Sequence, residues 1–166
     1  MVNREILFPK ALSHNNERCD VYYAETDNFS EIPDNLKLKA HAVCFYDGKM
    51  LLVNHITWNL WGIPGGSREP EETIEATLER EILEESNCKV ETCAPIAYHR
   101  VVHPDGEMHY RLKYICNVIP IGRFTADPAG HIAKTTWINP VDFEKYLEQK
   151  EHYIVFVRKA VELMAK

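Results

Sequence analysis

The chain has 166 residues, of which 45% are hydrophobic and 27% are charged, and these values are typical of one globular domain with a single core. No apolar run approaches the length of a membrane span, and the N-terminus lacks the charged and then apolar order of a secretory signal. The five cysteines include no Cys-x-x-Cys pair, so free buried thiols are expected. These features indicate a cytoplasmic protein without a membrane partner.

The negative charge of the chain is concentrated in one segment. Residues 68–85 contain eight acids and two bases, whereas the remaining sequence contains 17 acids and 17 bases. Duplex nucleic acid requires a basic face on its partner, and the sequence indicates none. A small anionic molecule could still bind beside the acids if a cation bridged the two, so a small-molecule partner is expected. A homodimer is compatible with the sequence as well.

The first half of the chain has β-strand character. Residues 1–36 have little pattern beyond a β-prone stretch at 19–23, and they are treated as an N-terminal extension of a domain that spans residues 1–166. Two further β-prone runs, 40–46 and 50–53, flank an Asp-Gly pair, which is a hairpin signal.

Residues 69–86 are expected to form a helix that is rich in glutamate. Pro70 suits the first helical position, and acids in the first turn complement the helix dipole. Asn87 is expected to end the helix in a left-handed conformation, which asparagine tolerates better than most residues.

The second half of the chain returns to strands before a final helix. Strands are predicted at 90–102, 109–118 and 135–138, and a helical region is predicted from Pro140 to the C-terminus with a break near Lys150. The order of elements predicts an α/β or α+β fold, an α/β/α sandwich in which helices cover a mixed β-sheet.

The acidic helix places several carboxylates on its core-facing side. An apolar stripe is formed by residues four apart, namely Ile74, Leu78 and Ile82. Glu85 falls on nearly the same line of the helix, and Glu81 and Glu84 lie beside it at spacings of three and four residues. Like charges directed inward are unfavourable unless a cation neutralises them. All-oxygen ligands suit Mg²⁺ or Mn²⁺, and the alternative is a solvated acidic helix face.

The glycine-rich segment before the helix favours the metal site. Gly65 and Gly66 allow the backbone to approach a ligand closely, and no Gly-Lys-Ser/Thr follows that would make this a P-loop. From Gly66 onwards the sequence resembles the Nudix box, G-x5-E-x7-R-E-U-x-E-E-x-G-U, in which U is apolar. Six of the seven fixed letters match over residues 66–88, and Asn87 stands in place of the last glycine. The chain thus resembles the Nudix hydrolase superfamily.

The resemblance implies a function and a set of site residues. Family members hold divalent metal with the box carboxylates, here Glu81, Glu84 and Glu85, and often with a carbonyl just before the box, here that of Gly65. By the same resemblance Arg80 belongs to the catalytic motif. It is expected to pair with Glu72 and so to brace the loops on either side of the helix. The implied reaction is Mg²⁺-dependent hydrolysis of the diphosphate linkage in a nucleoside diphosphate-X, such as a nucleoside triphosphate or ADP-ribose. Glu84 or Glu81 is the candidate general base.

One departure from the family pattern keeps a second hypothesis open. Many members carry a further glutamate on a loop before a late strand, and this chain has His131 there. His131 could act as the base or be an ordinary loop residue. The departure is compatible with a non-catalytic sensor that binds a nucleotide on a Nudix fold, whereas the complete set of box glutamates favours the hydrolase.

The histidines of the second half do not predict a zinc site. The spacing of His99, His103 and His109 matches no usual zinc pattern, and no neighbouring cysteine supports one. Positions in strands and turns explain these three residues.

Overall fold

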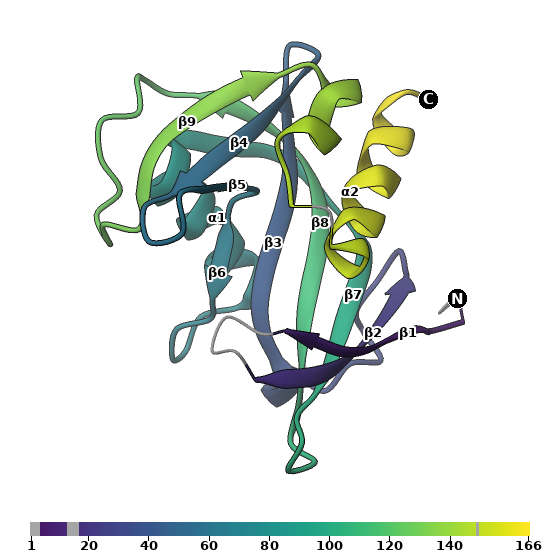
Figure 1. Cartoon of the computed structure of the whole chain (residues 1–166). Helices are drawn as coiled ribbons and strands as arrows, with labels where there is room; N and C mark the ends of the chain where they lie inside the picture. The colour runs from purple at the N-terminus through teal and green to yellow at the C-terminus, as the bar shows by residue number, and fades with distance from the viewer. Residues whose placement is uncertain (1–3, 13–16, 149) are drawn as a thin grey trace.

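The structure is a computed structural model that describes residues 4–12, 17–148 and 150–166 (Figure 1). Its strands are β1 (Ile6–Leu12), β2 (Arg18–Glu25), β3 (Lys37–Tyr46), β4 (Lys49–His55), β5 (Leu60–Gly62), β6 (Gly65–Ser67), β7 (Cys88–Val102), β8 (Met108–Pro120) and β9 (Ile132–Ile138). Its helices are α1 (Ile74–Ser86) and α2 (Glu151–Met164), with short 3-10 helices at Asp34–Leu36 and Pro140–Lys145. Within these described residues, no helix is both long and apolar enough to cross a membrane.

The described strands belong to a single sheet, which is mixed as expected. The order is β1-β2-β7-β8-β3-β4-β5, with β6 on β3 and β9 on β4. β3 and β8 run parallel, whereas β2–β7, β7–β8 and β4–β9 are antiparallel. The N-terminal extension therefore contributes two strands, since β1 and β2 continue the sheet beyond β7 (Figure 1).

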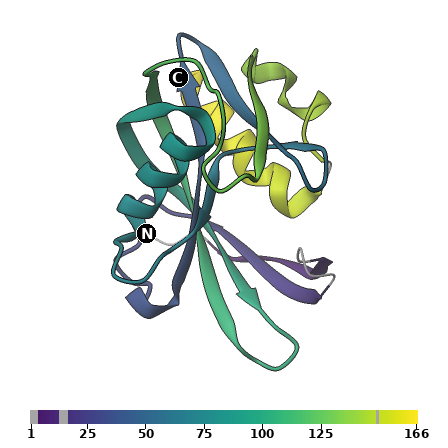
Figure 2. The same cartoon turned by 90° about the vertical axis from the view of Figure 1, so that its left-hand side faces the viewer.

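Side chains alternate along β3 between two hydrophobic cores. Ala40, Ala42 and Cys44 pack with α1, whereas Val43 and Phe45 pack with α2. Figure 2 shows the two helices on different sides of the sheet. This arrangement confirms the α/β/α sandwich, and it leaves α1 with one face on the sheet and one edge beside β6.

Helix α1 begins later than the sequence predicted. The predicted start at Glu69, with Pro70 in the first helical position, is wrong, because the helix begins at Ile74 after Thr73 as its N-cap. The Thr73 hydroxyl accepts a hydrogen bond from the Ala76 amide at 3.1 Å. Glu71 has a φ of +67°, which no α-helix accommodates, so residues 69–72 form a turn instead.

The end of α1 confirms the prediction for Asn87. This residue has φ 55° and ψ 40°, in the left-handed region, and its amide donates to the carbonyl of Leu83 at 2.9 Å. Asparagine thereby fills the position where the family motif has glycine.

The cysteines follow the prediction with one exception. All five are free, and four are buried, but Cys93 is exposed. Cys93 lies on β7, and the part of β7 that pairs with β2 begins only at Ala97. One side of β7 is therefore an open edge at Cys93.

Candidate metal and catalytic site

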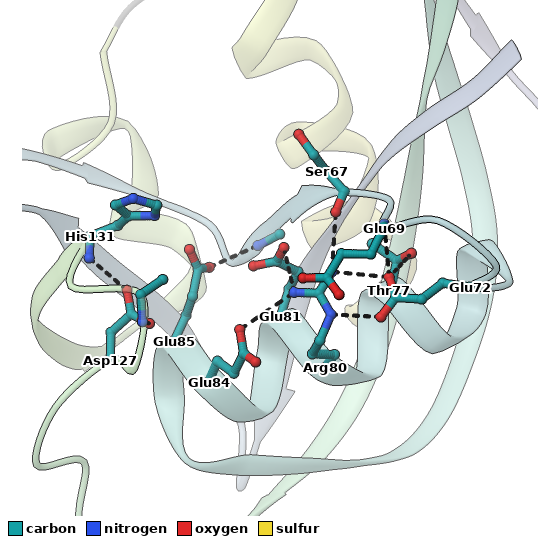
Figure 3. Close-up of polar contacts among 12 residues, drawn as sticks. Ser67, Glu69, Glu72, Thr77, Arg80, Glu81, Glu84, Glu85, Asp127 and His131 are labelled. Atoms are coloured by element: carbon teal, nitrogen blue, oxygen red, sulfur yellow. Dashed lines mark hydrogen bonds and ion pairs between the residues drawn. The ribbon is translucent and has the colours of Figure 1, made fainter.

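The apolar stripe of α1 positions its carboxylates. The stripe is buried, with exposed fractions of 4%, 1% and 0% for Ile74, Leu78 and Ile82. Glu85 continues the stripe and is only 5% exposed, as its place on the helical wheel suggested. The side chains of Glu81 and Glu84 are 15% and 30% exposed. The structure therefore gathers the three glutamates on the inner edge of the helix (Figure 3).

Glu85 is a buried carboxylate without a cationic partner among the described residues. Its Oε2 accepts one hydrogen bond, from the amide of Gly65 at 2.9 Å. Burial, together with the charges of Glu81, Asp127 and Glu84, raises the pKa of Glu85 to about 8 against the opposing effect of the Gly65 amide. Burial also raises the pKa of Glu81, despite the nearby guanidinium of Arg80. Among the described residues, Glu85 thus has no positive charge opposite its carboxylate.

Arg80 is directed mainly at the loop that precedes the helix. Its Nε and Nη2 lie 2.7 and 3.0 Å from the two carboxylate oxygens of Glu72, and Nη2 also donates to the carbonyl of Ser67 at 3.1 Å (Figure 3). The hydrogen bonds from Arg80 hold the pKa of Glu72 at about 2. Glu72 also accepts from the amide of Glu69 at 3.1 Å and the hydroxyl of Thr77 at 2.9 Å. Arg80 and Glu72 consequently fasten β6 and the turn to α1.

The same guanidinium reaches two of the clustered glutamates. Arg80 Nη1 lies 3.0 Å from Oε1 of Glu81 and 3.4 Å from Oε2 of Glu84. A single shared cation orients these carboxylates side by side but does not neutralise the whole cluster, which also contains Glu85.

The two glycines before the helix are required by close packing. A Cβ on Gly65 would lie 2.3 Å from the carbonyl oxygen of Ala40, and the residue has a φ of +143°. A Cβ on Gly66 would lie 2.2 Å from Oε1 of Glu81. The glycines therefore let the β6 backbone touch the glutamates directly. The role of the Gly65 carbonyl as a metal ligand stays a prediction.

The sequence analysis missed one acid of the site, Asp127. This residue is only 7% exposed, and its charge raises the pKa of both Glu81 and Glu85. Its carboxylate accepts hydrogen bonds from the amides of Ala129, His131 and Ile132 at 2.9, 2.8 and 3.1 Å. Asp127 therefore orders the loop before β9 and holds it beside the end of α1 (Figure 3). The signal in the sequence was Asp-Pro-Ala-Gly, since aspartate commonly caps such a turn.

His131 belongs to this same loop. Its side chain is exposed, and its backbone carbonyl accepts from the amide of Ile56 at 2.9 Å. The backbone of His131 thus joins the loop to the end of β4, and the ring lies on the Asp127 side of Glu85 (Figure 3).

Comparison with known proteins agrees with this geometry. The NUDIX domain family matches residues 36–159, so the chain belongs to the Nudix family. It is a hydrolase of the class that acts on phosphorus-containing acid anhydrides. No curated protein sequence matches the chain.

Solved structures share its fold at low sequence identity. A pyrophosphohydrolase of Bacillus subtilis, BsRppH, superimposes with a TM-score of 0.62 at 17% identity over 81% of this chain and 77% of that one. The NUDIX domain of Shewanella oneidensis NrtR, solved with ADP ribose, gives 0.61 at 18% identity over 82% and 94%. A MutT Nudix hydrolase of Burkholderia pseudomallei gives 0.55 at 22% identity over 75% and 94%.

Proposed function

We propose that this chain is a Mg²⁺- or Mn²⁺-dependent pyrophosphohydrolase that cleaves the diphosphate linkage of a nucleoside diphosphate-X, such as a nucleoside triphosphate or ADP-ribose. The observation that carries the proposal is the buried carboxylate of Glu85, which has a raised pKa and faces further carboxylates instead of a cation. A carboxylate cluster of this kind is unfavourable unless divalent cations occupy it.

The residues present fit such ions. Glu81, Glu84 and Glu85 offer only oxygen atoms, which suit the hard cations Mg²⁺ and Mn²⁺, and we propose the Gly65 carbonyl as a further ligand. When bound, the ions would neutralise the diphosphate and lower the pKa of the attacking water. Asp127 is proposed as a loop-ordering residue instead of a ligand, because backbone amides already occupy both of its carboxylate oxygens.

The chain itself supplies positioning and proton transfer. Arg80 holds Glu81 and Glu84 side by side, and we propose one of these two as the general base that takes the proton of the attacking water. The raised pKa of Glu81 suits that role, because a base with a raised pKa holds the proton more firmly. Arg80 acts through the carboxylates that it orients.

A basic surface of the sheet, formed by Lys39, His41, Arg111 and Lys113, supports an anionic substrate. Lys39 lies opposite Arg111, and His41 lies opposite Lys113, across the parallel pair β3–β8. On its other side His41 pairs with Gly65 of β6, so the basic surface begins next to the metal-binding loop.

Lys113 is the least exposed residue of this basic surface. It is 3% exposed, and its Nζ lies 3.2 Å from Nδ1 of His41 and 4.8 Å from the ring centre of Phe156. Burial, with the charges of Arg111 and Lys39, lowers the pKa of Lys113 well below its ordinary value. A bound anion would favour the protonated forms of these groups, and we propose a substrate phosphate as that anion.

The basic surface gives a direct prediction for Lys113→Met. Methionine has a similar volume and no charge, so the variant should fold and be at least as stable as the wild type in urea unfolding. The KM for the preferred substrate should rise by about tenfold, with kcat changed by less than about threefold, because an interaction equal in ground and transition states is lost. Lys145→Met, which removes an exposed lysine paired with Asp142, should leave both constants unchanged. An unaltered KM for Lys113→Met would show that the substrate does not bind at this surface.

The proposed activity is tested by a substrate panel. Purified protein is incubated with nucleoside triphosphates, ADP-ribose, nucleotide sugars and dinucleoside polyphosphates, and the products are separated by chromatography. At least one substrate should yield a nucleoside monophosphate, the activity should be lost in EDTA, and excess Mg²⁺ or Mn²⁺ should restore it.

The same panel separates the hydrolase from the sensor. The fold similarity to the NrtR domain solved with ADP ribose is the observation that favours a nucleotide sensor. Tight binding of a nucleotide in calorimetry, with no turnover in either metal, would establish the sensor and contradict the hydrolase.

A further inference from the structure

A second cluster of ligand atoms lies at the start of β2, away from the glutamates of α1. Glu17 and Cys19 lie at this strand end, and His103 follows directly after β7. Nδ1 of His103 is 2.9 Å from Oε2 of Glu17 and 3.5 Å from Sγ of Cys19, and the sulfur is 3.9 Å from the same carboxylate oxygen. All three side chains thus direct ligand atoms at one point.

The triangle of ligand atoms has the dimensions of a zinc site. Zinc binds sulfur at about 2.3 Å, imidazole nitrogen at about 2.0 Å and carboxylate oxygen at about 2.0 Å in tetrahedral geometry, which separates neighbouring ligand atoms by about 3.3–3.6 Å. The observed separations of 2.9, 3.5 and 3.9 Å bracket these values. Small side-chain rotations would bring all three separations into this range.

The cluster is closed on one side and open on the other. Cys19 is 1% exposed, whereas the side chains of His103 and Glu17 are 24% and 41% exposed. An ion can therefore enter from the side of Glu17, and a water molecule can complete its coordination there.

The other nitrogen of His103 already has a partner that could support a metal ligand. Its Nε2 lies 3.2 Å from Nδ1 of His109, and Arg111 Nε donates to Nε2 of His109 at 3.1 Å. A neutral imidazole carries one ring proton. An ion bound to Nδ1 of His103 therefore places that proton on Nε2, which then donates a hydrogen bond to Nδ1 of His109. His109 then gives up the hydrogen bond from Arg111, which makes its ring a reporter of metal binding.

We propose that Glu17, Cys19 and His103 bind one zinc ion, with water as the fourth ligand. The ion would tie the first residues of β2 to the end of β7, where the last pair of that ladder is Asp20 with Val102. Figures 1 and 2 show the paired strands β1 and β2 beside the part of β7 that leads into the β7–β8 turn. The ion would fasten the N-terminal extension to the sheet, and the water position would leave its coordination open on the Glu17 side.

The proposed site differs in chemistry from the carboxylate cluster. Thiolate and imidazole ligands select zinc or cobalt over Mg²⁺, whereas the glutamates of α1 offer only oxygen. The two sites therefore bind different ions, and the loss of one leaves the other intact. The spacing of the histidines in the sequence does not predict this site, because Cys19 is 84 residues from His103.

Cobalt tests the site directly, because a thiolate ligand gives Co²⁺ a charge-transfer absorption that oxygen ligands do not. Full-length protein is stripped with EDTA and titrated with Co²⁺ in excess Mg²⁺, and then with Zn²⁺ to displace the cobalt. We expect the charge-transfer band to saturate at one Co²⁺ per chain, to vanish on addition of Zn²⁺, and to be accompanied by a shift in the NMR signals of His109. Zinc should also raise the melting temperature of the protein.

Three single substitutions test whether the cobalt band comes from Cys19 or from another cysteine. Cys19→Ser should abolish the band, Glu17→Gln should weaken zinc binding at least tenfold, and Cys93→Ser, which alters the exposed cysteine, should change neither. Glu17 is partly exposed, so Glu17→Gln remains informative if Cys19→Ser does not fold. A band that persists in Cys19→Ser, or zinc affinity unchanged in Glu17→Gln, would overturn the proposal, as would the absence of any thiolate band in the wild type.

Discussion

Glu85→Gln should abolish most of the hydrolase activity and at the same time stabilise the metal-free protein at neutral and higher pH. The activity, as kcat with Mg²⁺, should fall by about 10²–10³-fold, because a charged ligand of the proposed metal is lost. The fold should persist, since the amide oxygen of glutamine can still accept the hydrogen bond from Gly65 that Glu85 accepts.

The effect on stability follows from the pKa of Glu85. The folded protein raises this pKa from 4.5 to about 8, so it favours the protonated form. The contribution of Glu85 to the stability of the metal-free protein is therefore most favourable below the unfolded value of 4.5, and it is lost as the pH rises from there to about 8. Glutamine does not ionise, so the variant should be more stable than the wild type at pH 8 by about 2–4 kcal/mol and equally stable at pH 4.

Urea unfolding at these two pH values, with EDTA and with saturating Mg²⁺, measures the effect. Mg²⁺ should remove the advantage of the variant, because it stabilises only the wild-type site strongly. Glu79→Gln serves as a matched control, because Glu79 is an exposed glutamate on the same helix and should change neither activity nor the pH dependence. Full activity in Glu85→Gln would exclude the metal site as drawn, and equal stability at pH 8 would show that Glu85 is compensated by another group.

Arg80→Ala should lower both activity and stability through the loop before α1. Without its guanidinium, Glu72 loses two hydrogen bonds while its side chain remains only 19% exposed. The free energy of unfolding should drop by about 1–3 kcal/mol, since a partly buried acid is left unpaired. We expect kcat/KM to fall by about 10–100-fold, which is typical when a group that orients metal ligands is removed.

The pH profile distinguishes positioning from a purely structural role. Arg80 lowers the pKa of Glu81, so its removal should raise that pKa and move the acid limb of the kcat/KM profile to higher pH. Arg80→Lys should retain part of the activity, because lysine supplies the charge but not the paired contact with Glu72. Arg158→Ala removes an exposed guanidinium bonded to Glu144 and provides the control. If Arg80→Ala lost stability but kept its kcat/KM and pH profile, the role of Arg80 would be purely structural.

Local sequence determined the parts of the site that lie within a few residues of one another. The four-residue spacing of Ile74, Leu78 and Ile82 fixed which face of α1 meets the sheet, and that in turn placed Glu85 inward. The glycines before the helix and Asn87 after it satisfy conformational requirements of single positions. Such requirements can also be predicted from the sequence. The start of α1 was wrong because Thr73 is the better cap and Glu72 is engaged by Arg80, eight residues further on.

Only the tertiary structure decided which distant residues join these local features. Asp127 reaches the glutamates because β9 pairs with β4, and the basic surface exists because β3 and β8 lie parallel with Lys39 and His41 opposite Arg111 and Lys113. Cys19 meets His103 because β2 pairs with β7. Helical spacing is set within the chain by backbone geometry, whereas strand partners are set by which segments bury their side chains together. The sequence therefore determined the acidic helix and its ends, and the pairing of strands decided everything that surrounds it.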